Sequence, residues 1–69
     1  MKLFFVDEHC PHVISYQVIE ETPQGFQIIA RNASVRMLEI MTTAHPGSVY
    51  EMSQADFNRL ISNQRGLPA

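Results

Sequence analysis

Two runs of alternating apolar and polar residues near the start of the chain predict a β-hairpin. The runs cover residues 13–21 and 26–31, are rich in β-branched and aromatic residues, and flank the turn-forming sequence TPQG. Such a pattern is typical of two antiparallel strands joined by a connection of four or five residues. A period of two places one apolar set on a shared face, which we expect to form the core floor: Ile14, Tyr16, Val18, Phe26, Ile28 and Ala30.

The reverse face of this hairpin is only half polar. Three aliphatic side chains fall on it among the polar ones: Val13, Ile19 and Ile29. A solvated sheet face normally carries polar residues at these positions. We therefore expect another element or another molecule to cover this face.

Two further strands are predicted outside the hairpin. Residues 3–6, with the sequence LFFV, are apolar on both faces, as expected of a strand at the centre of a sheet. The polar stretch 7–11 interrupts the pattern and reads as a loop. Residues 48–52 alternate again and predict a short strand.

Two helices complete the predicted elements. Residues 34–44 carry apolar side chains at helical spacing, with Asn32 or Ser34 as N-cap, although a strand remains an alternative because the segment is short and ends in two threonines. The second helix begins at a sequence like a capping box, SQAD, and places Phe57, Leu60 and Ile61 on one face. We expect residues 66–69 to form a frayed tail.

The elements predict a single α+β domain covering residues 1–69, in the order β-β-β-α-β-α. Its sheet is expected to be small, four-stranded and mostly antiparallel, with two helices packed on it. The strand, helix and strand of residues 25–52 could also form a crossover if the two strands pair in parallel.

The small size of this domain limits its stability, so contact with another molecule would stabilise it. The chain has 69 residues, of which 45% are hydrophobic, so it has a core but buries only about 60% of its unfolded surface. Cys10 is the only cysteine, so no internal disulfide can help. A lone thiol without a signal peptide or membrane span fits a reducing cytosol, and we expect a cytoplasmic protein that binds a partner, including a second copy of itself as a homodimer.

The most reactive stretch is the sequence HCPH of residues 9–12. Two imidazoles and a thiol are zinc ligands, so His9, Cys10 and His12 define an alternative function as a metal-binding domain. Their spacing differs from that of structural zinc sites, and solvated loop residues are the simpler interpretation. Cys10 beside a histidine could also act as a nucleophile, but no substrate pocket is indicated, and we expect neither catalysis nor a cofactor.

Charge disfavours direct binding to nucleic acid. The formal net charge is -2, and the five Lys and Arg residues are scattered along the chain. Nucleic-acid binders usually concentrate positive charge on one face. Arg59 and Arg65, on or next to the second helix, give thin support to a regulator that places this helix in a groove.

These observations favour a non-enzymatic, intracellular protein-binding module. Its type is that of small bacterial or bacteriophage accessory proteins that modulate or inhibit a partner by occupying its surface. The residues expected to contact the partner are Val13, Ile19 and Ile29 on the reverse hairpin face, and Tyr50 on the last strand. Acidic pairs at 7–8 and 20–21 would suit a basic partner surface if they lie together.

Overall fold

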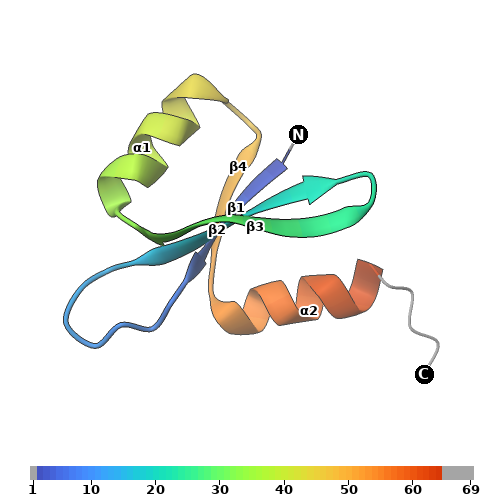
Figure 1. Cartoon of the computed structure of the whole chain (residues 1–69), viewed down its shortest axis with the longest axis horizontal. Helices are drawn as coiled ribbons and strands as arrows, with labels where there is room; N and C mark the ends of the chain where they lie inside the picture. The colour runs from blue at the N-terminus through green and yellow to red at the C-terminus, as the bar shows by residue number, and fades with distance from the viewer. Residues whose placement is uncertain (1, 65–69) are drawn as a thin grey trace.

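A computed structural model describes residues 2–64 and shows a four-stranded sheet with one helix against each face (Figure 1). The elements follow in the order β1 (Lys2–Asp7), β2 (Tyr16–Thr22), β3 (Gly25–Ala33), α1 (Val35–Ala44), β4 (Val49–Met52) and α2 (Gln54–Gln64). This order and the α+β class confirm the fold predicted from the sequence. The expected tail at 66–69 lies outside the described residues.

The sheet has the strand order β3-β2-β1-β4. β1 pairs antiparallel with β2 and parallel with β4, so the sheet is mostly antiparallel. β3 and β4 therefore occupy opposite edges and do not pair with each other. The segment 25–52 crosses from one edge of the sheet to the other, with α1 over one face.

β1 is the central strand, and its side chains divide the core into two halves. Leu3 and Phe5 point towards α1, whereas Phe4 and Val6 point towards α2, and all four are buried. Side chains alternate between the two faces of a strand, so a run that is apolar at every position contributes to the core on both faces of the sheet. Each half of the core therefore depends on one helix.

The two halves of the core differ in their side chains. The α1 side is mainly aliphatic, with Leu38 and Met41 of the helix packed on the buried residues Leu3, Phe5, Tyr16, Val18 and Ala33. The α2 side is aromatic, because Phe57 meets both Phe4 and Phe26 at centroid distances of 5.8 and 5.4 Å. Leu60 and Ile61 complete the predicted buried stripe of α2.

Side-chain caps fix where each helix begins. The Ser34 hydroxyl accepts a hydrogen bond from the Met37 amide at 3.2 Å, which confirms a helix rather than a strand in this segment. Ser53 does the same for the Asp56 amide at 3.1 Å. Gly47, with a φ of 80°, makes the turn that returns the chain to β4, a conformation that suits glycine.

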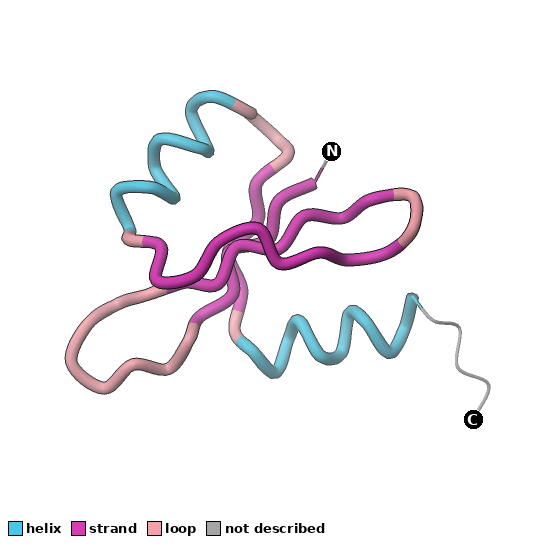
Figure 2. Tube along the Cα trace, in the orientation of Figure 1, coloured by secondary structure: helices cyan, strands magenta, loops and turns pink. Residues whose placement is uncertain are grey.

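The β2–β3 hairpin is tighter and less regular than the sequence pattern predicts. Thr22 pairs with Gly25, so the connection has two residues in place of four or five (Figure 2). The register shifts twice, between the partners of Tyr16 and Val18 and between those of Val18 and Ile19. These irregularities insert extra residues into β3 and interrupt its alternation.

The expected core floor of the hairpin is therefore only partly correct. Tyr16, Val18 and Ala30 do lie on the α1 side, but Phe26 packs on the α2 side. Ile28 is exposed on the edge strand, and Ile14 precedes β2 in an exposed loop. The bulges in β3 account for the change of side between Phe26 and Ala30.

Candidate partner-binding surface

The loop of residues 8–15 joins β1 to β2 and is held in place by polar contacts. The backbone amide of Glu8 donates to the Ser15 carbonyl at 3.0 Å, and the Ser15 hydroxyl donates to the Glu8 carboxylate at 2.5 Å. The second oxygen of that carboxylate lies 3.5 Å from the Asn32 amide on β3. Glu8 thus closes the loop at its base and ties it to the edge strand.

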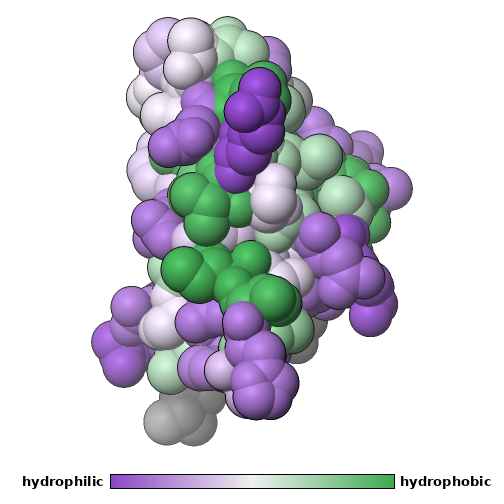
Figure 3. Space-filling model, turned by 90° about the vertical axis from the view of Figure 1, so that its left-hand side faces the viewer, coloured by the Kyte–Doolittle hydropathy of each residue, from purple (hydrophilic) through white to green (hydrophobic). Residues whose placement is uncertain are grey.

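Aliphatic side chains of this loop are exposed to solvent. Val13 is 64% exposed and Ile14 is 65% exposed, the two highest values among the large hydrophobic residues of the described chain. Figure 3 views the side of the molecule on which α1 and the loop lie, and it shows hydrophobic atoms over both. Val35 and Ile40 of α1 are also exposed. Because Val13 and Ile14 are exposed, their burial does not contribute to the conformation of the loop.

A groove of about 610 Å³ lies between this loop and the junction of β4 with α2. We call it the loop groove. It is lined by Asp7, His9, Cys10, Val13, Ile14, Tyr16, Glu51, Met52 and Ser53. Its volume is within the range of protein ligand sites, and its lining combines aliphatic side chains with two carboxylates.

The side of the groove nearest the core is formed by Tyr16, which is buried and donates a hydrogen bond to the carboxylate of Glu51. This hydrogen bond, together with burial and the negative charges of Glu51 and Asp7, raises the pKa of Tyr16 to about 12. The phenol is therefore a neutral donor at physiological pH. The two carboxylates whose charges act on this phenol, those of Asp7 and Glu51, also line the groove.

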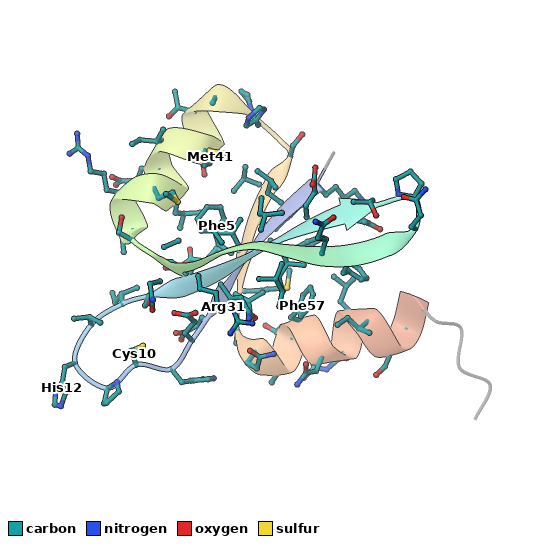
Figure 4. All side chains as sticks on the ribbon, viewed as in Figure 1. Phe5, Cys10, His12, Arg31, Met41 and Phe57 are labelled. Atoms are coloured by element: carbon teal, nitrogen blue, oxygen red, sulfur yellow. The ribbon has the colours of Figure 1, made fainter. Side chains whose placement is uncertain are left out.

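The predicted metal ligands do not converge. His9, Cys10 and His12 are all exposed, and His12 projects from the outside of the loop while the thiol of Cys10 lies towards its inside (Figure 4). Within residues 2–64, no group of three or more His, Cys, Asp or Glu side chains could hold a metal ion. These three residues are therefore close in sequence, but their side chains do not surround a common point.

The four residues predicted to contact a partner are found in different surroundings. Val13 is on the loop rather than on a strand, and it lines the groove. Ile19 is 4% exposed beneath α2, so it offers no surface to a partner in this structure. Ile29 is half exposed at a β3 bulge, and Tyr50 stacks on Phe4 with its ring partly exposed.

Other residues of the groove were missed at the sequence level. The sequence predicts Ile14 in the core because it continues the alternation of Tyr16 and Val18. Glu51 and Met52 reach the groove only because β4 pairs with β1, where Glu51 is next to Phe5 and Met52 is next to Val6. A pairing between segments so distant in the chain has no local signal.

The charges near α2 do not form a basic surface. Arg59 lies 3.3 Å from Asp56 one turn earlier on the same helix, and Lys2 lies 3.9 Å from Glu21 across two strands. Arg65, the other cation expected near this helix, is outside the part of the chain that the structure describes. Among residues 2–64, no helix is long and apolar enough to cross a membrane.

Comparison with known proteins identified no relative. No protein-family model matches the sequence. No curated protein and no solved structure has significant similarity to it. A functional proposal therefore depends on the geometry of the chain itself.

Proposed function

We propose that this chain is a small non-enzymatic protein-binding module that acts inside the cell by occupying a surface of another protein. The observation that supports it is the exposure of Val13 and Ile14 on a loop whose base is closed by hydrogen bonds between Glu8 and Ser15. Burying side chains of this size stabilises a protein by about 1.5–3 kcal/mol each. A partner that covers them gains this contribution, less the entropy lost on binding.

Size gives a second reason. A domain of 69 residues has little stability to spare, yet eight large hydrophobic side chains are exposed among the described residues 2–64: Val13, Ile14, Ile28, Ile29, Val35, Met37, Ile40 and Tyr50. Single exposed hydrophobic residues are normal on any protein, but a group on one loop and the adjacent helix indicates an interaction surface. A second copy of the chain is among the partners that we propose.

Retention of proteins from a host lysate tests this function. Immobilised protein is compared with the double variant Val13→Ser/Ile14→Ser, and with Ile28→Ser as a matched control on the edge strand. Because the side chains at 13 and 14 are exposed, their replacement should change the free energy of unfolding by less than about 0.5 kcal/mol each. We expect the double variant to lose specific proteins that the control still retains.

Identical retention by the wild type and the folded double variant would contradict the proposal. Self-association is measured separately by light scattering across micromolar concentrations. A mass that rises towards that of a dimer, and falls back in the double variant, supports a second copy as partner. A monomeric mass at every concentration removes the homodimer from the proposal.

A further inference from the structure

The loop groove has two chemically different kinds of lining. Val13 and Ile14 from the loop supply an apolar surface. Asp7 at the end of β1 and Glu51 on β4 supply carboxylates. No Lys or Arg is among the described residues that line it. The groove therefore offers an apolar surface and negative charge to the same ligand.

The two carboxylates are held in place but retain acceptor capacity. One oxygen of Glu51 accepts the hydroxyl of Tyr16, and Oδ1 of Asp7 accepts the backbone amide of His9 at 2.9 Å. Each ionised carboxylate has a second oxygen that can accept further hydrogen bonds. The hydrogen bond to Glu51 is also the main cause of the raised pKa of Tyr16, to which burial and the negative charges of Glu51 and Asp7 add.

A ligand that fits this groove needs a cationic head on an apolar stem. Lys and Arg side chains have this composition, since they lay their methylene groups on apolar surfaces and keep the charged end near water or an anion. A bare metal ion would not use Val13 and Ile14, and a wholly apolar side chain would not use Asp7 and Glu51. The negative net charge of the chain also favours association with a basic surface.

We propose that the loop groove binds an arginine or lysine side chain presented by the partner protein. This inference rests on the proposed function and specifies the chemistry of the partner. The cationic head lies between Asp7 and Glu51, and the stem lies against Val13 and Ile14. The loop thus acts as one wall of a pocket for a basic side chain.

Nuclear magnetic resonance titration with two short peptides tests this proposal. The probes are acetyl-Leu-Arg-Leu-amide and the same peptide with citrulline, a neutral side chain of nearly equal shape, in place of arginine. We expect the arginine peptide to cause saturable shifts in backbone amides of residues 7–16 and 51–53. The citrulline peptide should bind about tenfold more weakly, because two ion pairs are lost.

Isosteric variants show which residues are responsible. Asp7→Asn and Glu51→Gln keep an acceptor for the His9 amide and the Tyr16 hydroxyl, so the fold is retained. Each should weaken the arginine peptide about two- to fivefold and leave the citrulline peptide unchanged. The neutralised pair Glu39→Gln/Asp56→Asn, on α1 and α2 outside the groove, is the control and should have no effect.

Three results would overturn the proposal: equal affinity for both peptides, shifts confined to other surfaces, or no saturable shift. These failures differ from a failure of the proposed function, which depends on Val13 and Ile14 in the retention experiment. If Val13→Ser/Ile14→Ser loses its partner while Asp7→Asn/Glu51→Gln retains it, the module binds proteins but does not select a basic side chain.

Discussion

Tyr16 on β2 donates its hydroxyl to the carboxylate of Glu51 on β4, across the central strand β1. The ring of Tyr16 also packs edge-on against Phe5 of β1, with centroids 5.8 Å apart. The phenol therefore joins three strands at the end of the sheet where the 8–15 loop and α2 begin. Its contacts hold the base of the loop groove in one arrangement.

Tyr16→Phe keeps the aromatic packing and removes only the hydroxyl. We expect a loss of about 1–2 kcal/mol in the free energy of unfolding, since hydrogen bonds to charged groups contribute more than neutral ones and the exposed Glu51 regains water. Urea unfolding followed by circular dichroism measures it. Tyr50→Phe is the control, because its hydroxyl makes a longer, exposed bond of 3.3 Å to Gly47, and its cost should stay below about 0.5 kcal/mol. Equal costs would contradict this role of Tyr16.

The raised pKa of Tyr16 predicts a loss of stability in alkaline solution. An unfolded tyrosine loses its proton near pH 10, whereas the folded one retains it to about 12. Between these values the unfolded state binds fewer protons, so the free energy of unfolding falls as pH rises. This contribution is fully present below pH 10 and is lost by pH 12.

Comparison of the wild type with Tyr16→Phe isolates that contribution. The difference in unfolding free energy between the two proteins should shrink as pH rises from 9 to 11. Absorbance at 295 nm gives a second readout, because Tyr16→Phe should remove the ionisation phase near pH 12. A constant difference across this range would show that the Tyr16 phenol is not protected.

Removal of the Glu8 carboxylate should release the 8–15 loop. Glu8→Ala eliminates the bonds to the Ser15 hydroxyl and the Asn32 amide, which are the side-chain contacts of Glu8 at the loop base. Exchange of the Glu8 and Asn32 amides, which are hydrogen-bonded at the loop base, should become at least several-fold faster, while exchange in β1 changes little. Glu39→Ala on the exposed surface of α1 is the control. Unchanged exchange in the loop would show that other contacts order it.

Phe57 is the buried anchor of α2, and its truncation should be severe. Phe57→Ala leaves a cavity against Phe4 and Phe26 and should cost about 3–5 kcal/mol. A domain of this length has a total stability of only about 3–10 kcal/mol, so the variant should be largely unfolded at 37 °C by circular dichroism. Ile40→Ala, at a site 55% exposed on α1, should cost less than about 0.5 kcal/mol. Similar melting temperatures for both variants would contradict this difference.

Much of the fold could be predicted because its local patterns are uninterrupted. The alternation in β1 assigns Leu3 and Phe5 to one side and Phe4 to the other, and the structure confirms it. The helix starts at Ser34 and Ser53 were predictable as well, because capping depends only on the next few residues.

The sequence does not predict which face each β3 side chain occupies, because a β-bulge has no signature in the amino-acid composition of the strand. Ile28 pairs with Ile19 and Ala30 pairs with Val18, which leaves Ile29 between them without an opposing residue. Asn32 has a φ of 56°, a conformation that asparagine adopts more readily than most residues. Nothing in the sequence locates the insertion at Ile29, so a period of two predicts Phe26 on the side of Ala30, whereas it packs on the opposite side.

The candidate site was predictable only in part. The apolar side chain of Val13 predicts a contact with a partner, but the pattern puts Val13 on a strand, whereas the structure places it on a loop. The sequence does not indicate Glu51, because this residue becomes part of the groove through the parallel pairing of β4 with β1. Sites that combine distant segments depend on topology, which a single sequence specifies poorly.

The bulges of β3 also affect how copies of the chain can meet. A flat outer strand of nine residues would present free amides and carbonyls on which further chains could stack without limit, as they do in amyloid fibrils. The irregularities near Ile29 and Asn32 twist that ladder, and at the opposite edge β4 is only four residues long. The chain can therefore expose the hydrophobic side chains of its 8–15 loop at high concentration, while the irregular edge strand disfavours strand-to-strand polymerisation.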